Sequence, residues 1–216
     1  MRSRFDGQLA QLNREMIEMG ALCEEIISMV SDALTQWDDN LNEHIMPVAN
    51  AIDQKERDIE ALCLKMLLQQ QPVAKDLRVI SAALKMITDM ERIGDQAEDI
   101  AEIITYLDGR TVTELHQIRQ MANATIRMVT ESVDAYVKQD IALAQAAIAH
   151  DDIVDRFFDE MKHLLIEWIS KKPEHGEFAL DLLMICKYFE RIGDHATNIA
   201  EWVIFSVTGT HEEAPC

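Results

Sequence analysis

The sequence predicts an all-α protein built from two repeated three-helix bundles. Its 216 residues are rich in Ala, Leu, Ile, Met, Glu and Gln, which favour helices, and include only seven Gly and four Pro. No segment keeps the alternation of apolar and polar residues that is typical of a half-buried strand. A twelve-residue segment, ERIGDQAEDIAE at 91–102, returns as ERIGDHATNIAE at 190–201 with nine identical positions. An internal repeat of this kind indicates that one structural unit occurs twice.

Helical composition and stop signals place three helices in the first half of the chain. The polar stretch 38–40 loosens the end of the first helix, and Pro47 fits the first turn of the second, where a missing N–H is tolerated. The third begins near Pro72 and stops at Gly109, because Gly is the usual residue just past a helix end. These helices are expected at about 9–37, 43–70 and 72–107.

Three further helices fill the second half. A loop at 171–176, which contains Pro173 and Gly176, stops the fifth helix. Gly209 and a polar tail follow the sixth. These helices are expected at about 113–138, 141–170 and 177–207.

The repeat extends beyond the twelve-residue segment. Asp53 and Asp155 are equivalent at a separation of 102 residues, whereas the two copies of the segment are 99 residues apart. The second half is therefore three residues shorter between its second and third helices. The break near Gly109 divides the chain into a first repeat, 1–108, and a second repeat, 109–216, packed end to end or side by side.

Charge and cysteine content exclude several classes of protein. The net charge of −19 argues against a nucleic-acid partner, because nothing offsets phosphate repulsion, and suits cations or basic protein surfaces. The alternative interpretation is that the charge only keeps a helical protein soluble. The four cysteines form no C-x-x-C pair, so reduced thiols in a cytoplasmic protein are the simplest interpretation. We find neither a signal-peptide-like apolar stretch nor the roughly 20 apolar residues of a membrane span.

The repeated segment places carboxylates on one face of an otherwise apolar helix. At about 100° per residue, the following side chains share that face: Glu91, Asp95, Asp99 and Glu102 in the first copy, and Glu190, Asp194, Asn198 and Glu201 in the second. The second helix of each half adds further oxygens: Asp53 and Glu56 in the first, and Asp151, Asp152 and Asp155 in the second. Clustered carboxylates repel one another, and a bound cation reverses that repulsion. Carboxylates on facing helices are also how bundles build metal sites.

The acidic faces have a second interpretation, in which they are solvated and neutralised by basic side chains such as Arg92, Arg78 or Lys85. The sequence leaves both interpretations open. Gly94 and Gly193 lie within the helices, where Gly costs about 1 kcal/mol relative to Ala. Close approach of a neighbouring helix is the expected compensation.

Catalytic signatures are missing from the sequence. There is no Gly-rich phosphate loop and no nucleophile–base motif, so we expect the chain not to be an enzyme. The alternatives are a metal-binding helical-bundle protein, a di-iron-type enzyme or a purely structural adaptor. The Glu-x-x-His pairs common at di-iron sites are missing, which argues against the enzyme.

At these residues the sequence closely resembles the PhoU family, the accessory and regulatory proteins of the phosphate-specific transport system. The matching segments are QQPVAKDLR at 70–78, MERIGDQAEDIAE at 90–102, Val154-Asp155, and FERIGDHATNIAE at 189–201. The resemblance covers nearly the whole chain, and two copies of the motif after PVAKDLR make it specific. The second half has no equivalent of QQPVAKDLR, so the two bundles should differ at that loop.

The resemblance implies a cytoplasmic protein, peripheral to membrane complexes and homodimeric, made of two three-helix bundles. It implies negative regulation of phosphate uptake and of the phosphate-starvation response, through contacts with the transporter ATPase subunit and a sensor histidine kinase. It also implies iron or another divalent cation in multinuclear clusters. The metal-ligand candidates that carry over are Glu91, Asp95, Asp99, Glu190, Asp194 and Asn198, with Asp53 and Asp155 from the second helix of each half. Asn198 stands where the first copy has Asp99, so the two sites are not expected to bind metal equally.

Overall fold

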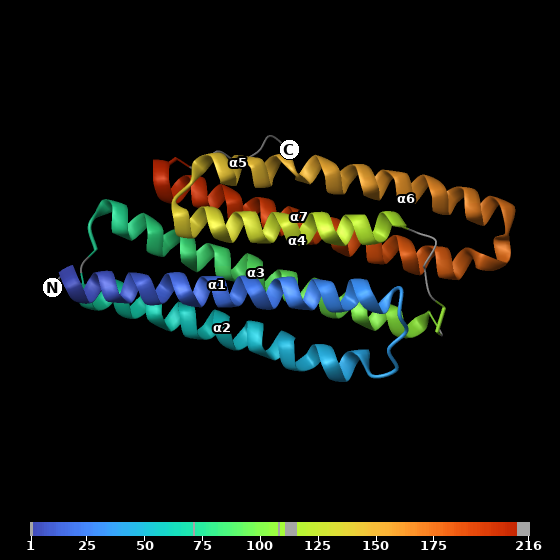
Figure 1. Ribbon diagram of the computed structural model, residues 1–216, viewed down its shortest axis with the longest axis horizontal. Coiled ribbons are helices and arrows are strands. Elements are labelled where there is room, and N and C mark those ends of the chain that lie inside the picture. Colours follow the sequence, from blue (N-terminus) through green and yellow to red (C-terminus); the bar gives the residue numbers. More distant parts are fainter. Residues whose placement is uncertain (1, 71, 108, 111–115, 211–216) are drawn as a thin grey trace.

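The computed structural model describes residues 2–70, 72–107, 109–110 and 116–210 (Figure 1). These residues form seven α-helices, a short 3₁₀ turn at Pro173–His175 and no strand, which confirms the all-α prediction. The helices are α1 (Arg2–Ala33), α2 (Leu41–Gln70), α3 (Ala74–Tyr106), α4 (His116–Lys138), α5 (Ile141–Ala149), α6 (Asp151–Lys171) and α7 (Gly176–Thr208). The start of the fourth helix predicted at 113 lies outside the described residues.

The two bundles lie side by side, not end to end (Figure 1). The first bundle contains α1, α2 and α3, and the second contains α4, the α5–α6 pair and α7. The bundles meet where α3 packs against α7 and α1 packs against α4, while α2 and α6 lie on opposite outer sides. The contact between α3 and α7 is the most extensive between any two helices of the described chain. The two helices that carry the repeated segment therefore form the centre of the molecule.

The predicted fifth helix is interrupted at His150, which separates α5 from α6. The His150 amide is shared between the carbonyl oxygens of Ala146 and Ala147, 3.1 Å from each, so the α-helical ladder tightens there. The imidazole also forms a 2.7 Å ion pair with Glu131 of α4. At the other end of α5, the Asp140 carboxylate caps the helix by accepting from the Leu143 amide. The contact between His150 and Glu131 joins two helices, so the periodicity of either helix alone does not predict it.

The ends of the first two helices also differ from the prediction. α1 stops at Ala33 because the amides of Thr35 and Gln36 both bond to the Asp32 carbonyl and close a turn. α2 begins at Leu41, so Pro47 lies in its second turn and removes a hydrogen bond from the helix. The predicted stop after α3 is confirmed, since Gly109 has a left-handed φ of 75°.

The helices with the acidic faces were expected to be otherwise apolar, and the structure buries an apolar face of each in the core. Both faces are buried: Ala82, Met86, Ile93, Ala97, Ile100 and Ile104 in α3, and Ile185, Ile192, Ala196, Ile199 and Val203 in α7. The close approach expected at the two glycines is confirmed as well. A Cβ on Gly94 would lie 3.2 Å from Ile52, and one on Gly193 would lie 3.1 Å from the Asp151 carboxylate. Each glycine therefore lets the second helix of its repeat approach the helix with the acidic face.

Candidate functional site

The first candidate site, called the first acidic site, consists of Asp53 and Glu56 from α2 and Glu91, Asp95 and Glu98 from α3. Ile52 rests on Gly94, and this contact brings the neighbouring Asp53 and Glu56 toward α3. Burial and then the charges of Asp95, Glu56 and Asp53 raise the pKa of Glu91. Burial followed by Asp95 and Asp53 likewise raises the pKa of Glu98. The α2 and α3 carboxylates therefore share one electrostatic environment.

A basic side chain partly neutralises the first acidic site. Arg92 Nη1 lies 2.9 Å from Asp95 Oδ2, and Arg92 Nε lies 3.5 Å from Glu91 Oε2. More than half of the Arg92 side chain is exposed, so these ion pairs are screened by solvent. Arg92 is one of the basic residues that the solvated-face interpretation named, and at this site that interpretation has structural support.

The second candidate site, called the second acidic site, consists of Asp151 and Asp155 from α6 and Glu190 and Asp194 from α7. Burial and then the charges of Asp155, Asp194 and Glu190 raise the pKa of Asp151 to about 6. Burial and the charge of Glu190 also raise the pKa of Asp194. Lys187 Nζ forms a 2.5 Å ion pair with Glu190 Oε2 and supplies the nearest compensation.

Asp151 is the side chain of the second acidic site whose surroundings best suit a cation ligand. Its Oδ1 is buried, has no hydrogen-bond partner in the part of the chain that the structure describes, and lies against Gly193. A buried carboxylate oxygen without a partner is costly, and hard cations such as iron or Mg²⁺ accept such ligands. Among the described residues, however, no three Asp, Glu, His or Cys side chains already converge on one point. A metal would therefore require side chains of the site to turn toward it.

Two of the eight predicted ligands lie at the contact between α3 and α7. Asn198 Nδ2 donates to Asp89 Oδ1 at 3.2 Å, and His195 Nδ1 lies 2.9 Å from the same oxygen. On Asp99, burial raises the pKa of the carboxyl, while a hydrogen bond from Tyr188 of α7 lowers it. Asp99 is thus at the edge of the first acidic site, within reach of the Asp95 charge, and Asn198 is directed to α3.

The structure brings the other predicted ligands together in two groups. Asp53, Glu91 and Asp95 meet in the first acidic site, and Asp155, Glu190 and Asp194 meet in the second. Glu98, Asp89 and Lys187 were not singled out from the sequence. Of these three residues, the repeat draws attention to Asp89, because Asp89 and Tyr188 occupy equivalent positions 99 residues apart. Asp89 of the first copy contacts Asn198 of the second, and Tyr188 of the second copy contacts Asp99 of the first.

Comparison with known proteins decides the family. A family model described as the PhoU domain matches residues 16–104 and again residues 118–203. The chain belongs to the PhoU family. Because the two matches fall on the two bundles, each bundle is one PhoU domain. Membership of a family of accessory proteins agrees with the prediction that the chain is not an enzyme.

Relatives in the PhoU family match the chain over nearly its full length. A phosphate-specific transport system accessory protein PhoU homolog from Clostridium acetobutylicum is 36% identical over 214 residues, 96% of each chain. The Pseudomonas aeruginosa homolog is 32% identical over 96% of this chain and 86% of its own.

Solved PhoU structures share the fold. The crystal structure of PhoU from Pseudomonas aeruginosa has a TM-score of 0.88 at 32% identity, covering 95% of this chain and all of that one. The phosphate transport system regulatory protein PhoU from Streptococcus pneumoniae has a TM-score of 0.87 at 25% identity, covering 97% of this chain and all of that one. Within the described residues no helix is long and apolar enough to cross a membrane.

Proposed function

We propose that this PhoU-family chain is a negative regulator of phosphate uptake and of the phosphate-starvation response. The observation that carries the proposal is the match of both bundles to the PhoU domain, joined to near-full-length relatives named as phosphate-specific transport accessory proteins. The two bundles offer helical surfaces and the sequence offers no catalytic motif, so regulation acts through contacts between folded proteins.

The proposed partners are the phosphate transporter ATPase subunit and a sensor histidine kinase, met in the cytoplasm by a homodimer. The net charge of −19 supports partners with basic surfaces, because opposite charges accelerate encounter and fix orientation. Such contacts weaken as salt rises, since the Debye length shrinks from about 10 Å at 0.1 M to about 3 Å at 1 M. A pull-down at two salt concentrations would therefore test whether the contacts are electrostatic, since electrostatic contacts should retain less partner at the higher salt concentration.

We also propose that the two acidic sites bind iron or another divalent cation. Asp53, Glu91 and Asp95 would hold it in the first site, and Asp151, Asp155, Glu190 and Asp194 in the second. All the donors are carboxylate oxygens, which accept several hard cations. A bound cation would supply positive charge where the carboxylates repel one another, and this would fix α2 against α3 and α6 against α7.

A phosphate-responsive reporter in a deletion strain tests the regulatory proposal. Without the chain, the reporter should stay on in phosphate-rich medium, because a restraint has been lost. Expression of the wild-type chain from a plasmid should switch it off again. A deletion strain whose reporter still responds normally to abundant phosphate would sink the proposal and leave a plain metal-binding or adaptor protein as the better assignment.

A further inference from the structure

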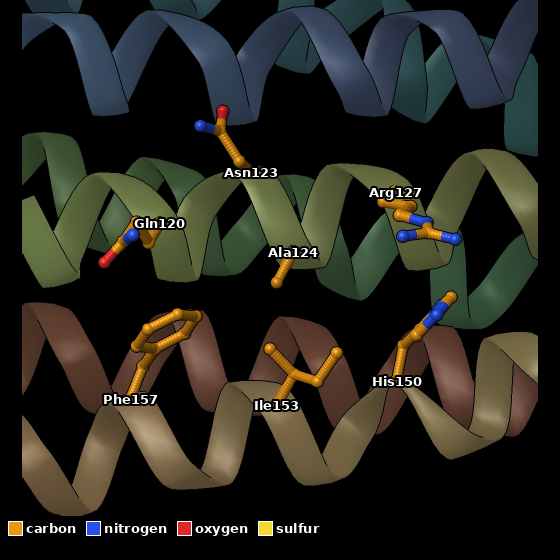
Figure 2. A pocket seen from close by; sticks show the side chains of 7 residues that line it. All are labelled: Gln120, Asn123, Ala124, Arg127, His150, Ile153 and Phe157. Carbon is orange, nitrogen blue, oxygen red and sulfur yellow. The ribbon is translucent and has the colours of Figure 1, made fainter.

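A small groove opens between α4 and α6, beginning at His150 just before α6 (Figure 2). Its volume is about 260 Å³. The groove is lined by Gln120, Asn123, Ala124, Arg127, His150, Ile153 and Phe157. Figure 2 shows Gln120, Ala124 and Arg127 of α4 opposite Phe157, Ile153 and His150, whereas Asn123 points toward α1. The groove thus has an aromatic end, an apolar middle and a cationic end.

No Asp or Glu lines this groove, in a chain with 39 acidic and 20 basic residues. Glu131 lies beyond its cationic end and accepts from Arg127 Nε and from His150 Nδ1, each at 2.7 Å. These contacts fix both side chains. Arg127 uses only Nε in this bond and is 62% exposed, so its other guanidinium N–H groups can still receive an anion.

The other end of the groove offers an aromatic face and an amide. The guanidinium carbon of Arg156 lies 5.5 Å from the centre of the Phe157 ring, within cation–π range. Gln120 is seven residues from Arg127 along α4, and Phe157 is seven residues from His150, which separates the two ends by roughly 10 Å. A flat ring on Phe157 and an anion on Arg127 would therefore fit one ligand about that long.

The first repeat treats the equivalent surface differently. At the separation of 102 residues, Lys55 of α2 stands where the second repeat has Phe157, and Glu18 of α1 where it has Gln120. Lys55 Nζ bridges to α1 by ion pairs with Glu15, at 2.5 Å, and with Glu18. The first repeat therefore ties α1 to α2 across this surface, whereas the second presents an aromatic ring and an amide.

We propose that the α4–α6 groove binds a nucleoside monophosphate. The phosphate lies on the remaining N–H groups of Arg127, the base stacks on Phe157, and the Gln120 amide hydrogen-bonds the edge of the base. Stacking on an aromatic side chain contributes about 1–3 kcal/mol per base, and a guanidinium binds phosphate by paired hydrogen bonds. This site is independent of the proposed regulatory function and of the acidic sites.

Calorimetric titration of the purified full-length chain tests the ligand class. Adenosine 5′-monophosphate should bind, while adenosine and inorganic phosphate should each bind at least about tenfold more weakly, since each lacks one of the two groups. Absence of binding by the monophosphate would overturn the proposal. Inorganic phosphate binding as tightly as the nucleotide would also overturn it, because the Phe157 end would then contribute nothing.

Variants locate the binding. The double change Gln120→Glu and Phe157→Lys installs the ion pair of the first repeat and should abolish binding, and a thermal melt shows whether the variant folds. The milder Arg127→Gln should weaken binding of the monophosphate at least about fivefold and leave binding of adenosine unchanged. Glu25→Gln, at the position of α1 equivalent to Arg127, is the matched control and should leave binding unchanged. Unaltered binding by both groove variants would place the ligand elsewhere and refute the proposal.

Discussion

The two acidic sites carry the same segment of sequence but differ in what faces it. In the first repeat, α2 places the buried Ala49 at the position where α6 of the second repeat has Asp151. In the first site Arg92 pairs with Glu91 and Asp95. The equivalent Arg191 instead lies over the Tyr188 ring, and Lys187 compensates Glu190. The second helix of each repeat therefore supplies one difference between the sites, Asp151 in place of Ala49, and the basic side chains of α3 and α7 supply the others.

This difference adds a second reason to expect unequal sites. Asn198 in place of Asp99 indicated one carboxylate fewer in the second half. The structure directs Asn198 to Asp89 across the bundle contact, and it places Asp151 in the second site with an Oδ1 that has no hydrogen-bond partner among the described residues. Asp151 thus gives the second acidic site a half-buried carboxylate for which the first site has only Ala49.

The largest expected effect comes from making the first site resemble the second. Ala49→Asp would bury a carboxylate at a position that is 4% exposed. We expect a loss of about 2–4 kcal/mol in the free energy of unfolding without metal, because a buried charge is desolvated. Urea unfolding at neutral pH in the presence of a chelator measures this loss. Ala49→Asn separates the effect of the charge from that of the added volume. Equal losses for the two variants would contradict the comparison.

Cation binding should stabilise the two sites unequally. At 100 times its dissociation constant, a cation raises the free energy of unfolding by about 2.7 kcal/mol. In melts with Mn²⁺ or Fe²⁺, the pair Asp151→Asn and Asp194→Asn should remove more of this gain than the pair Asp53→Asn and Asp95→Asn. A chelator should abolish the gain in the wild-type chain. Melting curves that ignore both cation and chelator would favour the solvated-face interpretation.

Asp151→Asn should stabilise the chain without metal, and only above acidic pH. Because burial raises the pKa of Asp151 from 3.8 to about 6, the folded chain binds this proton more tightly than the unfolded chain does. Ionisation therefore costs stability. The cost is absent below about pH 4, grows up to about pH 6 and is complete above it.

We expect the Asp151→Asn gain to be about 1–2 kcal/mol at pH 7.5, after allowance for solvent screening and for the favourable field of the α6 N-terminus. Thermal melts with a chelator at pH 7.5 and at pH 4 measure it, with Asp152→Asn on the exposed side of the same turn as the control. A gain of the same size at both pH values would show that ionisation is not its cause.

The smallest effect concerns Arg92. Arg92→Gln removes both ion pairs of the first site and should cost about 0.5 kcal/mol at low salt, because exposed pairs contribute little. The loss should vanish near 1 M salt, where charges are screened within about 3 Å. Chemical unfolding at the two salt concentrations provides the measurement. A salt-independent loss would indicate that the Arg92 side chain acts through packing.

The sequence alone determined the fold class, the repeat and the family of this chain. The apolar faces of the third and sixth helices, the two close-packed glycines and the stop at Gly109 all follow from helical periodicity and from the special geometry of Gly. Each of these features depends on residues within one helix or one turn, so a short segment of sequence is enough to predict it. The acidic faces were visible for the same reason.

Only the tertiary structure decided which carboxylates meet. A helix turns about 100° per residue, so Glu91 and Asp99 differ by roughly 80° in direction, enough to place Asp99 toward α7 while Glu91 faces α2. At the helix break, His150 pairs with Glu131 of another helix, and the Asp151 oxygen without a partner in the described residues lies against Gly193 of α7. The His150 and Asp151 contacts join different helices of the second bundle, and the Asp99 contact joins the two bundles. Their geometry is fixed by the packing of helices against one another, which no local pattern records.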